Sequence, residues 1–178
     1  MTTKRPDIPQ VADELTTLVA FLDWTRATLR MKAGDLDAEQ LGRTLEPSTM
    51  TLGGLVTHLA WVESWWFVEV FLGQEPAEPW ASFDWKADGD AEWSVAAELT
   101  PEEIWALWDR EVANARRILD ESGGLDAIAV GHRKRKPGEP LSMRWIVVHM
   151  IEEYARHVGH ADLIRESVDG LVGEDPPG

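Results

Sequence analysis

The chain has 178 residues, a formal net charge of −15 and no cysteine, and 44% of its residues are hydrophobic. Its length fits one domain with a buried core, and the lack of cysteine excludes disulfides, thiolate metal ligands and a cysteine nucleophile. The acidic charge argues against nucleic acid, which requires clustered Lys and Arg. No signal peptide or membrane span is apparent, so we expect a soluble, cytoplasmic protein without a membrane partner.

The first half of the chain predicts two helices, over about residues 8–32 and 51–71. Apolar residues recur at helical spacing in both segments. Thr51 is a suitable N-cap for the second helix, which we expect to stop before Gly73. The loop between the helices contains glycine and proline.

Residues 73–99 have little periodicity, and a connection of this length is usually functional or covers another part of the domain. The third helix has the clearest start in the chain, because Thr100, Pro101 and Glu103 form a capping-box sequence with proline at the first helical position. We expect this helix to end at two glycines, at positions 123–124.

The fourth predicted helix starts after Ser142, another good N-cap, and runs to Gly170. Before it, residues 125–140 are irregular and are compatible with a short hairpin around residues 136–138. The basic run at 132–136 is either a solvated loop or an anchor for an anionic substrate or thiol cofactor.

Four long helices with one long connection between the second and the third predict an all-α protein, a four-helix bundle with a crossover. We expect this bundle to cover residues 1–172. Residues 173–178, which contain two acids, two prolines and two glycines, are expected to be a flexible acidic tail.

The fourth predicted helix carries four groups that can bind a metal: His149, Glu153, His157 and His160. Their spacing of four, four and three residues keeps neighbouring members on one helix face. Zinc, nickel and iron accept imidazole nitrogen and carboxylate oxygen, and His58 in the second helix is the natural additional ligand. The alternatives are a hydrogen-bonded core histidine at position 58 and a surface His–Glu pair on the last helix.

Two segments resemble the DinB-like superfamily. Residues 51–67, TLGGLVTHLAWVESWWF, resemble its second helix, and residues 144–166, with the run ARHVGHAD, are similar to its uncharacterised DUF664 branch. Residues 12–15 and 21–24 also fit this branch, so the resemblance covers nearly the whole chain. It implies a four-helix bundle, often a homodimer, that holds a divalent metal ion.

The resemblance also implies a set of metal ligands. The histidine of the superfamily's second helix falls on His58, and the histidine of its last helix falls on His157. Four residues earlier stands Glu153, as in the mycothiol-dependent maleylpyruvate isomerases, whereas many other members have histidine there. The implied triad is therefore His58, Glu153 and His157, with zinc or nickel as the metal. We assign His160 to a substrate-facing, proton-relay role, with plain packing as the alternative.

Ten tryptophans are unusual for this length. Trp65 follows His58 by seven residues, so it returns close to the same helix face and is predicted to line the site and contact a bound cofactor; the alternative is an aromatic core stripe.

The resemblance implies an enzyme that uses a divalent metal to bind a low-molecular-weight thiol, such as mycothiol. The enzyme then transfers the thiol to a small electrophile, or isomerises a substrate with its help. The alternatives are a metal-binding stress-response bundle without turnover and a metal-dependent hydrolase.

Overall fold

The structure, a computed structural model, describes residues 5–131 and 138–173. Within these ranges the protein is all-α, and the β pairings are isolated bridges. The longer elements are α1 (Glu14–Ala33), α3 (Leu52–Ser64) with the π-helix η1 (Trp65–Phe71) directly after it, α5 (Pro101–Glu121) and α6 (Met143–Asp169). The short elements are α2 (Ala38–Leu41), η2 (Trp80–Ser82), α4 (Ala91–Ser94) and η3 (Val95–Glu98). No helix in this part of the chain is long and apolar enough to cross a membrane.

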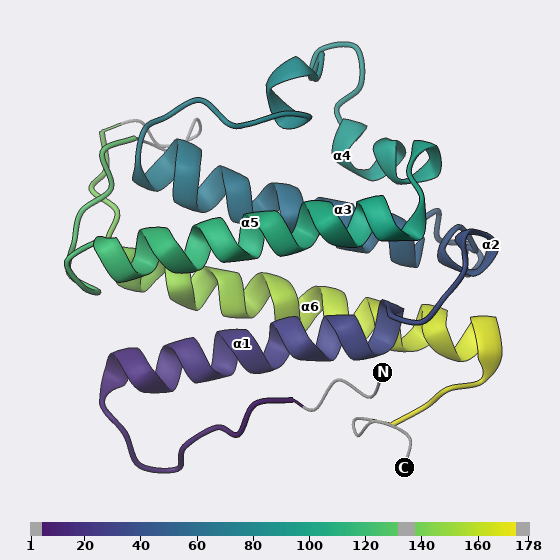
Figure 1. Cartoon of the computed structure of the whole chain (residues 1–178), viewed down its shortest axis with the longest axis horizontal. Helices are drawn as coiled ribbons and strands as arrows, with labels where there is room; N and C mark the ends of the chain where they lie inside the picture. Colours follow the sequence, from purple (N-terminus) through teal and green to yellow (C-terminus); the bar gives the residue numbers. More distant parts are fainter. Residues whose placement is uncertain (1–4, 132–137, 174–178) are drawn as a thin grey trace.

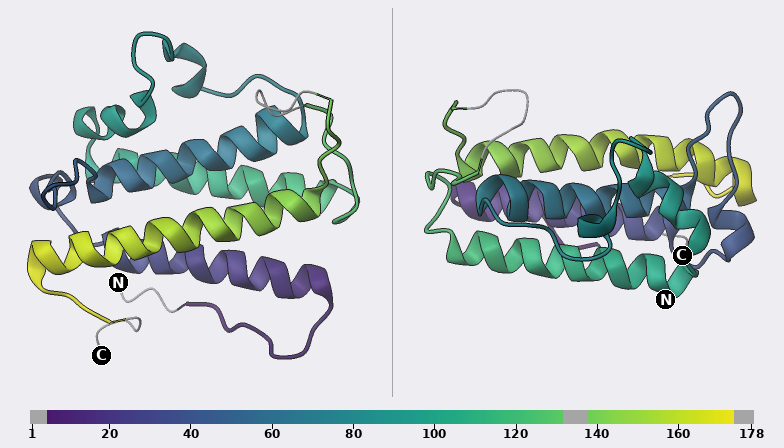
Figure 2. Two further views of the ribbon diagram at one scale, coloured as in Figure 1. Left: turned by 180° about the vertical axis from the view of Figure 1, so that it is seen from behind. Right: turned by 90° about the horizontal axis from the view of Figure 1, so that it is seen from above.

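The four long helices pack as a helical bundle. α1 packs along α6, α3 packs along α5, and α3 also contacts α6. Figures 1 and 2 show the four helices side by side with their long axes roughly aligned. The connection between η1 and α5 carries η2, α4 and η3, and both α4 and η3 contact α3. The long connection predicted from the sequence therefore covers one side of α3.

Helix starts follow the predicted caps. The Thr51 hydroxyl accepts a hydrogen bond from the Gly54 N–H at 3.0 Å, and Thr100 forms the predicted capping box. Ser142 caps α6 in the same way, and α6 ends at Gly170, whose φ of 79° lies in the left-handed region that favours glycine. Three of the four predicted helices are confirmed at both ends to within a few residues.

The first helix starts later than predicted, at Glu14 rather than at residue 8, because the Asp13 carboxylate accepts the N–H of Thr16 at 3.0 Å and caps it there. The predicted loop after α1 contains the short helix α2, which has a capping box of its own. The basic run 132–136 lies outside the described residues. Of the predicted hairpin tip at residues 136–138, only residue 138 is described. Beside them, Ile128 and Ser142 form an antiparallel bridge.

A buried polar network ties together all four long helices. Glu63 of α3 is fully buried and accepts two hydrogen bonds from Arg26 of α1, at 2.8 and 2.7 Å. It also accepts the hydroxyl of Tyr154 of α6 at 2.8 Å, and that hydroxyl accepts the indole N–H of Trp108 of α5 at 2.9 Å. Burial, followed by the negative charge of Glu63, raises the pKa of Tyr154. Because Tyr154 directly follows Glu153, the network fixes the rotation of α6 at the candidate site.

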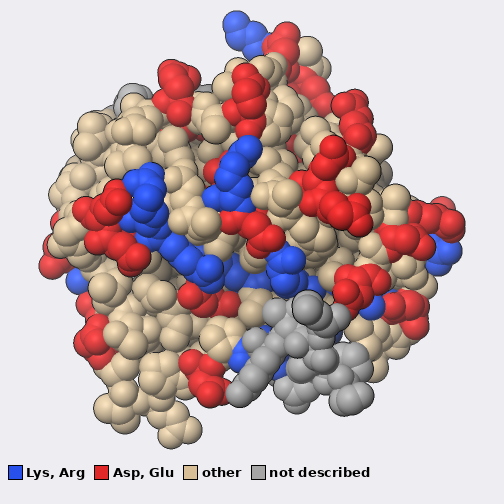
Figure 3. All heavy atoms as spheres, viewed as in Figure 1, with Lys and Arg blue, Asp and Glu red and all other residues tan. Residues whose placement is uncertain are grey.

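Acidic and basic side chains are interspersed on the face formed by α1 and α5 (Figure 3). Arg116 pairs with Asp23 at 2.9 Å, and Arg117 pairs with Glu121 at 2.6 Å. Such exposed pairs contribute little to stability, so the bundle depends mainly on its apolar core, to which all four long helices contribute.

Candidate metal centre

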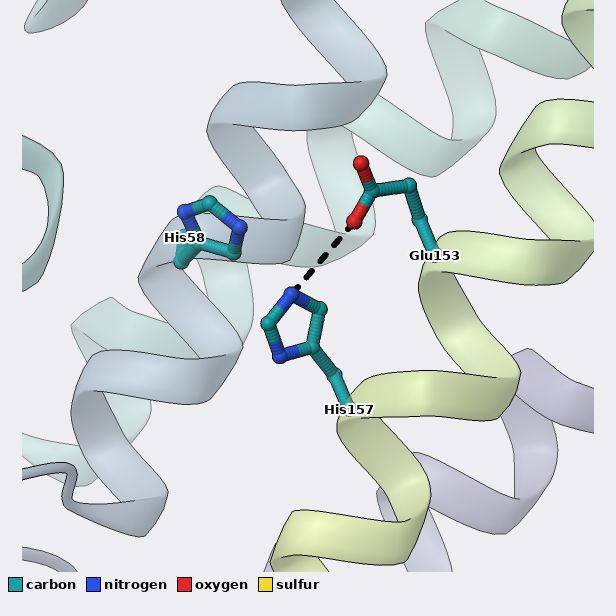
Figure 4. A group of neighbouring side chains, drawn as sticks. All are labelled: His58, Glu153 and His157. Atoms are coloured by element: carbon teal, nitrogen blue, oxygen red, sulfur yellow. Dashed lines mark ion pairs between the residues drawn. The ribbon is translucent and has the colours of Figure 1, made fainter. Parts of the chain in front are cut away.

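Three potential metal ligands from two helices converge at one point. His58 lies near the middle of α3, and Glu153 and His157 lie one turn apart on α6. Figure 4 shows the three side chains directed toward one another across the gap between these helices. One ligand atom from each residue lies within 4.8 Å of the others, and the two imidazole centroids are 4.8 Å apart. The structure thus brings together the three residues that the resemblance implies.

His58 is held in place by two neighbours from the long connection. Its Nδ1–H donates to Glu92 Oε1 at 3.2 Å, and its ring stacks on Trp93 with 4.4 Å between centroids and 21° between planes. This hydrogen bond leaves Nε2 as the nitrogen available to a metal. Glu92 is only 5% exposed, and its second oxygen is buried with no hydrogen-bond partner among the described residues.

Sequence reasoning missed Glu92 and Trp93, because the segment that carries them has no periodicity. The one usable signal was general: a metal-binding histidine normally donates its other nitrogen to a carboxylate or a carbonyl.

The α6 side of the site is a chain of polar contacts. Nε2 of His157 lies 3.4 Å from Glu153 Oε2, and Nδ1 of His157 lies 3.4 Å from Nδ1 of His160. Burial, followed by the positive charges of His157 and Arg156, lowers the pKa of His160. His160 therefore lies against a ligand candidate, on the side away from Glu153.

Glu153 joins two clusters. Its other oxygen, Oε1, lies 3.3 Å from Nε2 of His149, whose Nδ1 is 3.2 Å from the exposed carboxylate of Glu152. Hydrogen bonds from His149 and then His157 hold the pKa of Glu153 well below its ordinary range. His149, Glu152 and Glu153 form a second, more exposed group of possible metal ligands. His149 also stacks on Trp145, with 4.9 Å between centroids.

An open cavity of about 690 Å³ reaches the site. Glu153 and His149 form part of its wall, and most of the remainder is aromatic, contributed by α3, η1 and the long connection. Trp65 is one of the lining residues. The ring of Trp65 contacts that of Trp61, with 5.8 Å between centroids, and Trp61 in turn lies 6.0 Å from the ring of His58. The ring that covers His58 is Trp93.

The donor set fits a divalent ion. Two imidazoles and one carboxylate are the ligand types that zinc and related metals take, and three protein ligands leave a coordination position for an exogenous group. The carboxylate of Glu92 beside Nδ1 of His58 is the kind of partner that metal-binding histidines usually have.

The protein is thus a helical bundle with a candidate metal centre, formed by His58, Glu153 and His157, beside a cavity lined mainly by aromatic residues. A family profile described as mycothiol-S-transferase matches residues 17–170, and the chain belongs to this family. The family is DinB-like, so the resemblance of the second and last helices is confirmed. Membership implies mycothiol S-transferase activity, with mycothiol and an electrophile as substrates. No curated protein matches the chain.

Proposed function

We propose that this protein is a metal-dependent mycothiol S-transferase. His58, Glu153 and His157 are the proposed ligands of one divalent ion, zinc or nickel. We further propose a DinB-like four-helix bundle over residues 1–172 that works as a homodimer in the cytoplasm. The observation that carries the proposal is the convergence of these three ligands, within 4.8 Å of one another, in a chain of the mycothiol-S-transferase family.

Each residue has a separate task in this proposal. A bound divalent metal supplies one property, a lower pKa for a coordinated thiol, so that thiolate is available near neutral pH. Glu153 provides the one negative charge among the three ligands, so an anionic thiolate is still attracted to the site. Glu92 and Trp93 orient the His58 ring through the 3.2 Å hydrogen bond and the stacking contact. Since the chain has no cysteine, the nucleophilic sulfur must come from mycothiol.

His160 and Trp65 have supporting roles. Nδ1 of His160 lies 3.4 Å from Nδ1 of His157, and this contact leaves the opposite nitrogen of His157, Nε2, for the proposed metal. We propose that His160 also carries the thiol proton toward solvent, because its ring lies beside His157 and is only partly buried. Trp65 forms part of the cavity wall, against which the substrates are held.

The test uses the purified full chain, stripped with chelator and reloaded with zinc or nickel. Conjugation of mycothiol to monobromobimane above the uncatalysed rate should require metal, and His157→Ala should remove this excess. Activity that does not depend on mycothiol would favour a hydrolase. Tight metal binding without any turnover would favour a storage or sensor protein. Arg117→Ala on the outer surface of α5 is the matched control, because Arg117 is exposed and pairs with Glu121 away from the site.

A further inference from the structure

A continuous wall of indole rings leads away from the candidate metal centre. It starts at His58, whose ring is 6.0 Å from that of Trp61. Trp61 stacks on Trp65 with 5.8 Å between centroids and 29° between planes, and it meets Trp85 at 5.3 Å and 42°. Trp61 and Trp65 come from α3 and η1, whereas Trp85 comes from the long connection. These three residues are called the indole wall below.

The indole wall differs from the tryptophans of the core. Trp80 also lines the cavity, but it is 1% exposed, and its N–H donates to Glu111 at 3.1 Å. The three indoles of the wall are instead half-buried and border the 690 Å³ cavity. Leaving large aromatic surfaces in contact with water is unfavourable. The cavity wall also carries the carboxylates of Glu69, Glu75 and Glu153, and a concave wall that combines aromatic surface with a few polar groups is typical of a small-molecule site.

The cavity has Glu153 and the indole wall as parts of one lining. A molecule lying on the wall therefore shares that cavity with one of the three proposed metal ligands. Flat conjugated rings gain most from such a surface, because offset-stacked and edge-to-face contacts add to the area buried. A small aliphatic molecule gains neither contact.

We propose that the cavity is the electrophile site and that its substrates are flat aromatic or conjugated electrophiles held against the indole wall. This inference rests on the proposed function for the reaction, but binding to the wall is independent of it. With 1-chloro-2,4-dinitrobenzene as the probe, the mycothiol sulfur forms a bond to the ring carbon that carries chlorine. The carbon–chlorine bond breaks, chloride leaves with the electron pair, and the thiol proton passes to water.

Binding is tested first, without turnover. The unreactive analogue 2,4-dinitrotoluene should quench the protein fluorescence saturably, with or without metal. Trp85→Ala should raise its Kd about three- to tenfold, because one stacking partner is lost, and Trp61→Leu should do the same if the first variant folds poorly. Trp105→Phe is the control, since Trp105 packs on Trp108 and Arg30 outside the cavity. Equal Kd values in all four proteins would overturn the proposal.

Selectivity is tested next. The ratio of kcat/KM for 1-chloro-2,4-dinitrobenzene to that for iodoacetamide, each relative to its uncatalysed rate with mycothiol, should be well above one. Trp85→Ala should lower this ratio about three- to tenfold. Conjugation without aromatic preference would overturn this inference and leave the proposed function standing. Saturable, Trp85-dependent binding without conjugation of any electrophile would overturn the proposed function and leave aromatic binding at the indole wall standing.

Discussion

Replacing Glu92 with glutamine should weaken metal binding without destabilising the metal-free protein. Glu92 Oε1 accepts the Nδ1–H of His58 at 3.2 Å, while Oε2 is buried with no hydrogen-bond partner among the described residues. A buried carboxylate with one unsatisfied oxygen costs about 1–3 kcal/mol. Glu92→Gln removes the buried charge, so the metal-free variant should be as stable as the wild type or more stable. The same change removes the charge that strengthens His58 as a ligand.

Loss of such a carboxylate partner typically lowers metal affinity by about 10- to 100-fold, which corresponds to about 1.4–2.7 kcal/mol. Glu92→Gln keeps an oxygen acceptor, so its effect should lie near the lower value, and that of Glu92→Ala near the upper one. Zinc affinity is measured by competition with a chromophoric chelator, and the Tm of the metal-free protein by circular dichroism. Glu98→Gln, in the exposed part of the same connection, is the matched control.

Two results would refute this reasoning. Unchanged zinc affinity in both Glu92 variants would mean that the carboxylate does not support His58. A parallel fall in affinity and in the Tm of the metal-free protein would mean that Glu92 acts by holding the connection in place. Only a loss of affinity in Glu92→Gln at constant or higher Tm supports the account.

Three further predictions concern α6. His157→Ala should abolish tight metal binding in elemental analysis, whereas His149→Ala should retain it, and equal losses would invalidate the assigned triad. Glu153→Ala should weaken zinc binding at least about tenfold while Glu153→His keeps it, because both side chains reach a metal from one turn before a helical histidine; similar affinities for Ala and His would contradict this. Tyr154→Phe should lower the free energy of unfolding by about 1–3 kcal/mol in urea titrations, since Glu63 loses a buried donor, and an unchanged value would show that the network is not needed.

The helix boundaries were predictable where a local hydrogen bond defines them. Thr100 with Glu103 and Ser142 cap α5 and α6 through neighbouring backbone groups, so the sequence window contains the whole interaction. The predicted start of α1 was wrong, because apolar residues continue at helical spacing before the actual N-cap at Asp13. The short helix α2 was missed, since four residues are too few to show a period.

The candidate site could be predicted only in part. The i, i+4 spacing of Glu153 and His157 guarantees that they share a helix face, but their meeting with His58 depends on how α3 and α6 pack. The resemblance to the DinB-like superfamily is what indicated that His58 joins Glu153 and His157. Glu92 and Trp93 belong to a connection whose path is determined by tertiary contacts with α3, so no local pattern indicated them.

The most direct test of the central claim is optical spectroscopy of the cobalt-substituted protein during titration with mycothiol. Coordination of the thiolate to cobalt should produce a saturable near-ultraviolet charge-transfer band in the wild type. The band should also form in the exposed-surface control Arg117→Ala and be absent in His58→Ala. Full cobalt occupancy without a new band, or the same band in His58→Ala, would contradict thiol activation at this metal centre.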